Sequence, residues 1–176
     1  TENIRQGGRR RGANMGILRV DHPDIVQFIE AKLDGKSFQN FNLSIAVTDA
    51  FMNAVSEKKD YFLVDPRTGK KAGALSASEI FEKITQSAWA TGDPGLVFID
   101  AINRANPTPA IGAIEATNPC GEVPLLPFEA CNLGSINLKL MVKNSKEIDW
   151  DKLSDTVALA TRFLDCLLYT SPSPRD

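Results

Sequence analysis

The sequence contains little histidine and little cysteine. His22 is the only histidine among 176 residues, and the three cysteines are Cys120, Cys131 and Cys166. A single histidine excludes a multi-histidine metal centre within this chain, and we expect no metal site. Three widely spaced cysteines cannot form the disulfide framework of a small secreted domain. This cysteine usage is typical of a reducing compartment and predicts a cytoplasmic protein.

Long hydrophobic runs and an excess of one charge are also missing. No apolar run approaches the ~20 residues that a membrane-spanning helix needs. Twenty basic against 22 acidic residues give a net charge of -2, whereas a nucleic-acid-binding protein usually has a strongly basic face. We therefore expect neither a membrane nor a nucleic acid as a partner. Hydrophobic residues make up 43% and charged residues 24% of the chain, which is typical of a globular domain.

The spacing of apolar residues predicts strands that alternate with helices over the first hundred residues. Strands are expected at 15–20, 41–47, 61–64 and 96–99, and helices at 23–35, from 48 or 49 to about 56, and from 76 to 92. The strand at 41–47 has one clearly apolar face. Such alternation indicates an α/β fold, but the strands are too few for a complete barrel.

The second part of the sequence is more irregular. Five prolines between Asn103 and Pro127 break regular structure there. Long irregular loops in compact domains are usually functional or disordered. A strand is expected at 133–140, and a final amphipathic helix follows from Leu153 to Leu167.

The segment that carries chemistry runs from Asn118 to Glu122. An amide, a thiol and a carboxylate alternate at Asn118, Cys120 and Glu122. In an extended loop, alternate side chains point the same way, so these three groups are expected to face one ligand. A lone cysteine is more often a small buried apolar residue. Zinc binding is disfavoured because Cys120 and Cys131 are eleven residues apart, with no Cys-x-x-Cys motif.

A longer run around these residues carries a family resemblance. Residues 118–138, NPCGEVPLLPFEACNLGSINL, closely resemble the large catalytic chain of ribonucleotide reductases, most of all the adenosylcobalamin-dependent class II form. The resemblance extends through GLVFID at 95–100, NPTP at 106–109, NFNLS at 40–44 and GGRRRGA at 7–13. It covers about residues 1–165.

The resemblance implies a fold and a set of catalytic residues. The chain would form part of a ten-stranded α/β barrel, incomplete here, with an inserted finger loop at about 116–132. Cys120 would carry the thiyl radical that takes the 3′ hydrogen of a ribonucleotide. Glu122 would be the general base on the 3′ hydroxyl, and Asn118 would hold the ribose hydroxyls. Cys131 would be one of two cysteines that reduce the substrate and form a disulfide.

The arginine-rich segment at 6–13 reads as a loop with two interpretations. A solvated run of charges is the plain one, because arginines of this kind usually face water. The resemblance implies the family's specificity loop, which lies between an allosteric nucleotide site and the substrate base, with Arg10 against the substrate. The substrate- and effector-binding residues implied are Gly7, Gly8, Arg9, Arg10, Arg11, Gly12 and Ala13.

The resemblance also implies cofactors and partners. These are adenosylcobalamin, ATP or deoxynucleotide effectors, a ribonucleotide substrate and a thioredoxin-like dithiol reductant, with a homodimer expected for the full-length enzyme. One alternative is the same reaction in a class I enzyme that depends on a metal-bearing subunit. Another is a nucleotide-binding module without catalysis, in which Cys120 and Cys131 are ordinary core residues.

The family enzymes are several times longer, and the chain is interpreted as a fragment. In the family, the redox partner of Cys131 lies upstream of Thr1. Residues 1–165 are expected to form the partial catalytic domain. Residues 166–176 depart from the family pattern and resemble translated adapter DNA, which predicts a non-native tail. A genuine C-terminus is the alternative.

Overall fold

The computed structural model describes residues 5–6, 10–144 and 146–170. The chain forms two compact units, residues 1–128 and residues 129–176. In the described part of the chain, no helix combines the length and the apolar character needed to cross a membrane.

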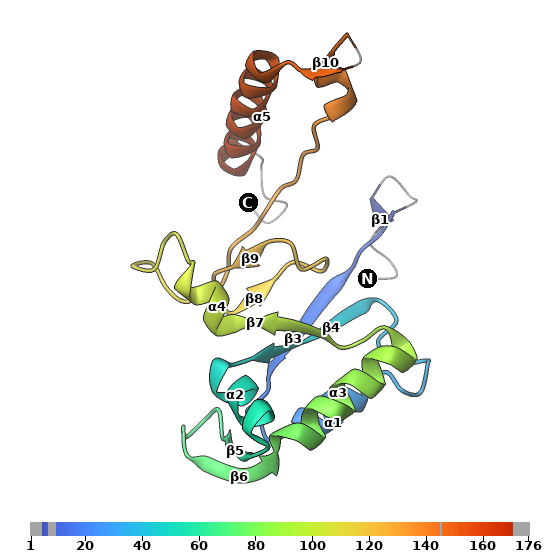
Figure 1. The fold of residues 1–176 in the computed structure, drawn as a ribbon, viewed down its shortest axis with the longest axis vertical. Coiled ribbons are helices and arrows are strands. Elements are labelled where there is room, and N and C mark those ends of the chain that lie inside the picture. Colours follow the sequence, from blue (N-terminus) through green and yellow to red (C-terminus); the bar gives the residue numbers. More distant parts are fainter. Residues whose placement is uncertain (1–4, 7–9, 145, 171–176) are drawn as a thin grey trace. The chain divides into compact units, whose positions relative to one another are not determined.

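A parallel three-stranded sheet lies at the centre of the first unit (Figure 1). Its strands are β3 (Asn14–Arg19), β4 (Phe41–Val47) and β7 (Gly95–Phe98), with β4 in the middle. Both neighbouring pairs run parallel, and Ser44 of β4 lies opposite Gly95 of β7. Parallel strands joined through helices confirm the predicted α/β class. The described strands form no closed barrel, consistent with an incomplete one.

One face of this sheet is covered by helices and a hairpin (Figure 1). The helices are α1 (Ile25–Glu30), α2 (Asp49–Glu57) and α3 (Ala77–Thr91), and the hairpin is β5 (Asp60–Val64) with β6 (Lys71–Ser76). The main hydrophobic core forms here, and it buries Ile45 and Val47 of β4 against Phe51 of α2 and Ile84 of α3. The helix predicted at 23–35 is shorter than expected, and β6 was not predicted.

Two helices of this layer begin at N-cap residues that the sequence indicates, and one of them also ends at an indicated glycine. The Thr48 hydroxyl accepts the Phe51 N–H at 3.1 Å, and the Ser76 hydroxyl accepts the Glu79 N–H at 3.4 Å. Both are N-cap interactions. Gly92 ends α3 in the left-handed region, at φ 84°, where glycine has no steric cost.

The opposite face of the sheet carries a second, smaller core. It consists of Ala46, Val97, Ile99, Ile114 and Leu126. Ile99 begins α4 (Ile99–Arg104), which the sequence did not predict, and the hairpin of β8 (Ala116–Thr117) and β9 (Pro124–Leu125) lies between Ile114 and Leu126. The prediction of one apolar face for β4 is incomplete, because residues 43–47 are buried on both faces.

The second unit contains one long helix. An irregular segment leads to a short 3-10 helix, η1 (Leu138–Met141), then β10 (Val142–Lys143), β11 (Glu147–Ile148) and α5 (Trp150–Thr170). The strand predicted at 133–140 is wrong. Leu133, Leu138 and Leu140 are each more than 60% exposed, so the apolar spacing there does not mark a buried strand face. Residues 171–176 lie outside the described residues.

Candidate active site

The segment Asn118–Glu122 forms the tight turn between β8 and β9. The Gly121 N–H donates to the Asn118 carbonyl at 3.0 Å, which closes a four-residue turn. Gly121 has φ 81°, a left-handed conformation that a side chain would disfavour. The expectation of an extended loop is therefore wrong: the chain reverses direction at Pro119 and Cys120.

The three predicted side chains of this turn have different environments. Asn118 is buried, and its Oδ1 accepts the Val123 N–H at 3.1 Å across the turn. Cys120 and Glu122 are both exposed. The alternative that Cys120 is a small buried core residue is therefore wrong, because its side chain is exposed. The turn brings an amide, a thiol and a carboxylate within five residues, with the thiol and the carboxylate open to a ligand.

Cys120 lines an open pocket of about 470 Å³ on the second face of the sheet. Side chains alternate between the two faces of a strand, and Ala46 belongs to the second core. Asn42 and Ser44 therefore lie on this face of β4, and both line the pocket together with Gly95 of β7. The pocket walls thus combine an amide, a hydroxyl and the thiol of Cys120. Such a polar cleft suits a small polar ligand.

Asn103 of α4 holds the base of the β8–β9 hairpin. Its Nδ2 donates to the Ile114 carbonyl at 2.9 Å, and its Oδ1 accepts the Ile114 N–H at 2.8 Å. The same Nδ2 lies 3.0 Å from the carbonyl oxygen of Ile99. With Ile114 and Leu126 buried in the second core, these contacts fix where the hairpin leaves the sheet.

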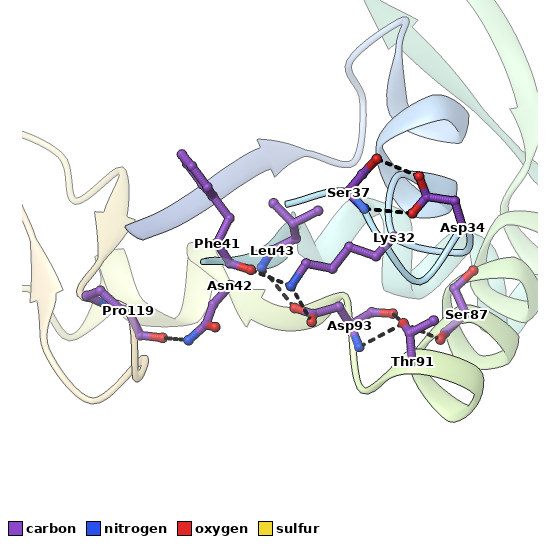
Figure 2. Close-up of polar contacts among 10 residues, drawn as sticks. All are labelled: Lys32, Asp34, Ser37, Phe41, Asn42, Leu43, Ser87, Thr91, Asp93 and Pro119. Atoms are coloured by element: carbon purple, nitrogen blue, oxygen red, sulfur yellow. Dashed lines mark hydrogen bonds and ion pairs between the residues drawn. The ribbon is translucent and has the colours of Figure 1, made fainter. Parts of the chain in front are cut away.

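Asn42 contacts the tip of the same hairpin. Its Nδ2 donates to the carbonyl oxygen of Pro119, the residue before Cys120 (Figure 2). Sequence reasoning did not identify Asn42 or Asn103 as site residues. The signal for Asn42 was its place in the run NFNLS at 40–44, which carries part of the family resemblance.

The remaining predicted site residues belong to the second unit, to the N-terminal segment, or to the part of the chain outside the described residues. Cys131 is exposed and belongs to the second unit. In the predicted specificity loop, Gly7, Gly8 and Arg9 lie outside the described residues. Antiparallel backbone pairing joins β1 (Arg5–Gln6) to β2 (Arg10–Arg11), so Gln6, Arg10 and Arg11 lie in short strands where a loop was expected. Gly12 and Ala13 follow it and lead into β3.

Residues 1–175 match the model of the ribonucleotide reductase barrel domain. The chain belongs to the ribonucleotide reductase family. The part of the reductase barrel present here includes the Cys120 turn and the pocket beside it.

Several curated reductases resemble the chain over nearly its whole length. A vitamin B12-dependent ribonucleoside-diphosphate reductase of Mycobacterium tuberculosis is 54% identical over 97% of the chain, and one of Thermoplasma acidophilum is 52% identical over 99%. A vitamin B12-dependent ribonucleotide reductase of Streptomyces avermitilis is 36% identical over 97%. These matches cover 25%, 23% and 21% of the three relatives, so the chain spans about a quarter of their length.

Proposed function

We propose that this chain is the part of a vitamin B12-dependent ribonucleotide reductase that carries the radical cysteine. The observation that carries the proposal is the turn of Asn118–Glu122, which holds the exposed Cys120 at the wall of a pocket on the sheet. Membership of the reductase family supports the assignment of this pocket as the place where the ribonucleotide binds beside Cys120. The names of the relatives support vitamin B12 dependence and disfavour the class I alternative.

Each group of the turn has a separate task in this proposal. Cys120, as a thiyl radical, takes the 3′ hydrogen atom of the ribonucleotide. Glu122 accepts the proton of the 3′ hydroxyl, for which its exposed carboxylate is suited. Asn118 uses its Oδ1 within the turn, and the described residues offer its Nδ2 no acceptor, so this donor is available to a ribose hydroxyl.

The overall reaction balances with a dithiol as reductant. The 2′ carbon–oxygen bond breaks and the oxygen leaves as water, while a carbon–hydrogen bond forms at the same carbon. Two thiols supply the two electrons and become a disulfide. Cys131 is one of them in this proposal, and Cys120 returns the 3′ hydrogen at the end. A thioredoxin-like dithiol then reduces the disulfide.

Adenosylcobalamin supplies the initiating radical when it is bound. The exposed thiol of Cys120 fits this role, because a buried thiol would be closed to an external radical. We assign no other described residue of the chain to the cobalamin.

Gly7 to Ala13 are proposed to contact the substrate base and to respond to nucleotide effectors. The full-length enzyme is proposed to be a homodimer.

The test uses a complete reductase that contains these residues, assayed without oxygen with a ribonucleotide, a dithiol and adenosylcobalamin. We expect deoxyribonucleotide from the unmutated enzyme and none from Cys120→Ser, because a hydroxyl cannot replace the thiyl radical. Glu122→Gln should lower kcat by about 100-fold or more. Glu115→Gln, an exposed carboxylate at the base of the same hairpin, is the matched control and should keep full activity.

Three results would contradict the proposal. Turnover by Cys120→Ser would remove the radical role of Cys120. Turnover by the isolated 176-residue chain would contradict the need for a second reducing cysteine beside Cys131. A protein that binds nucleotides with unchanged affinity in every variant, and never forms product, would instead be a binding module.

A further inference from the structure

The first three residues of β4 are held by a partly buried ion pair (Figure 2). Lys32 and Asp93 lie 2.7 Å apart, Nζ to Oδ2, and their side chains are only 14% and 21% exposed. Lys32 also donates to the carbonyl oxygen of Phe41, and Asp93 Oδ1 accepts the Leu43 N–H at 2.9 Å. The pair therefore contacts the backbone on both sides of Asn42.

Asn42 is the residue between these two fixed backbone groups, and its side chain reaches the hairpin tip. Figure 2 shows its amide directed at Pro119, away from Lys32 and Asp93. The contact joins residues 77 positions apart in sequence. Its acceptor is the carbonyl of the peptide that links Pro119 to Cys120. A displacement of Asn42 would therefore move the backbone that carries the thiol.

The hairpin needs a contact at its tip as well as at its base. Asn103 and the second core fix Ile114 and Leu126, but the turn lies several residues beyond them. The bonds from Gly121 and Val123 to Asn118 define the internal shape of the turn. These internal bonds do not attach the turn to the sheet. The Asn42–Pro119 hydrogen bond does attach it, because Asn42 belongs to β4.

We propose that Asn42 is a positioning residue, which holds the Cys120 turn on the sheet, and that the Lys32–Asp93 pair fixes Asn42 for this task. Asn42 lines the pocket, but its amide N–H is engaged by the Pro119 carbonyl, and the proposed role acts through this contact. The inference rests on the proposed radical role of Cys120. A radical hydrogen transfer needs the two reacting atoms at near-contact distance, and a displacement of about 1 Å can lower a rate by about 100-fold.

The test compares Asn42→Asp with Asn40→Asp in the complete reductase. Aspartate has the shape of asparagine, but an ionised carboxylate cannot donate to the Pro119 carbonyl. Asn40 lies two residues upstream, and its side chain makes no hydrogen bond with any residue that the structure describes. Each variant is measured for kcat, for the KM of the ribonucleotide, and for backbone hydrogen exchange of a peptide spanning 118–123.

For Asn42→Asp we expect kcat to fall about tenfold or more, with KM changed less than about threefold, because the thiol moves while substrate contacts remain. Exchange at residues 118–123 should become at least about threefold faster. Asn40→Asp should change none of the three quantities. Lys32→Met, which leaves Asn42 itself intact, should lower kcat in the same way and raise exchange at 118–123.

The outcomes separate this inference from the proposed function. If the unmutated enzyme forms no deoxyribonucleotide, the proposed function fails and the positioning role fails with it. If the unmutated enzyme is active and Asn42→Asp is equally active, only the positioning role fails. Faster exchange without a fall in kcat would also overturn it, because the contact would then hold the turn without serving the reaction.

Discussion

Asn118 accepts the backbone N–H of Val123 at 3.1 Å, so the side chain predicted to hold the substrate also closes the turn that carries Cys120. Asn118 is 9% exposed, and its carbonyl oxygen accepts the Gly121 N–H as well. The side-chain oxygen is thus structural, while the side-chain nitrogen is available for a ligand. The two roles can be separated by substitution.

We expect Asn118→Ala to destabilise the turn and Asn118→Asp to leave it intact, although both variants should lose reductase activity. Aspartate retains the oxygen that accepts the Val123 N–H and loses the amide donor, whereas alanine loses both. Alanine should therefore destabilise the turn by about 1 kcal/mol, seen as faster hydrogen exchange at Val123. Aspartate should leave that exchange rate unchanged. Both variants should lose most of the reductase activity, and an active Asn118→Asp would remove the substrate role of the amide.

The base of the hairpin gives a second prediction, at Asn103. Asn103→Leu removes both hydrogen bonds to Ile114 and leaves the Ile114 backbone groups without their partners. An unsatisfied buried backbone group costs about 1–3 kcal/mol. We expect the substitution to lower the midpoint of thermal unfolding and to speed exchange at 114–117. Asn53→Leu, on the exposed surface of α2, is the matched control and should leave both unchanged.

The sequence predicts the first unit well where local signals and burial agree. The strand at Phe41–Val47 and the helix that begins after Ser76 have the predicted bounds, because apolar spacing and N-cap residues act locally. The strand predicted at 133–140 is wrong, because apolar residues such as Leu133 and Leu138 show the same spacing although they are exposed. The hairpin strand β6 has no β-branched residue and forms by pairing with β5.

The candidate site could be predicted only in part. The turn at 118–122 was recognisable as a motif with specific residue types. The residues that hold this turn in place could not be predicted, because the contact of Asn42 with Pro119 joins segments that only the fold brings together. The same holds for Lys32 and Asp93, which are 61 residues apart in sequence. The expectation that Asn118, Cys120 and Glu122 face one ligand depends on an extended loop, whereas the Gly121 N–H and the Asn118 carbonyl close a turn.

Tyr61 gives a prediction for the effect of pH on stability. Its hydroxyl donates to the Val20 carbonyl at 3.0 Å, and its ring packs edge-on against Phe51 at 4.9 Å between centroids. Burial raises the pKa of the Tyr61 hydroxyl, and the Asp21 carboxylate raises this pKa further. The neutral hydroxyl is therefore favoured in the folded chain, and its contribution to stability is complete below the unfolded pKa of about 10.

Above about pH 10 the unfolded chain loses this proton and the folded chain retains it. The free energy of unfolding should then decrease by up to about 1.4 kcal/mol per pH unit, until the folded pKa is reached. Tyr61→Phe should abolish this slope and cost about 1 kcal/mol at pH 7. Urea unfolding of the chain between pH 8 and 11, roughly one unit or more either side of that pKa, measures both effects. Tyr169→Phe, 86% exposed in α5, is the control, and an unchanged slope in Tyr61→Phe would contradict the assignment.

The close approach of β4 and β7 beside the pocket gives the last prediction. A methyl group added at Gly95 would lie 2.9 Å from Ser44 Oγ and 3.9 Å from the Leu43 carbonyl oxygen. Ser44 is 7% exposed and lies opposite Gly95 in the parallel register, so its hydroxyl has little room to move. Gly95→Ala should therefore destabilise the sheet by about 1–3 kcal/mol through overpacking.

Removal of the hydroxyl should reverse this effect, because Ser44 Oγ is the closest atom to the added methyl group. We expect Ser44→Ala alone to change stability little, and the double variant Ser44→Ala/Gly95→Ala to recover most of the loss. The coupling energy from a double-mutant cycle should thus be at least about 1 kcal/mol. Additive effects would mean that the backbone of β4, and not the Ser44 hydroxyl, sets the spacing at Gly95. In that case the floor of the Cys120 pocket would be fixed by strand pairing alone.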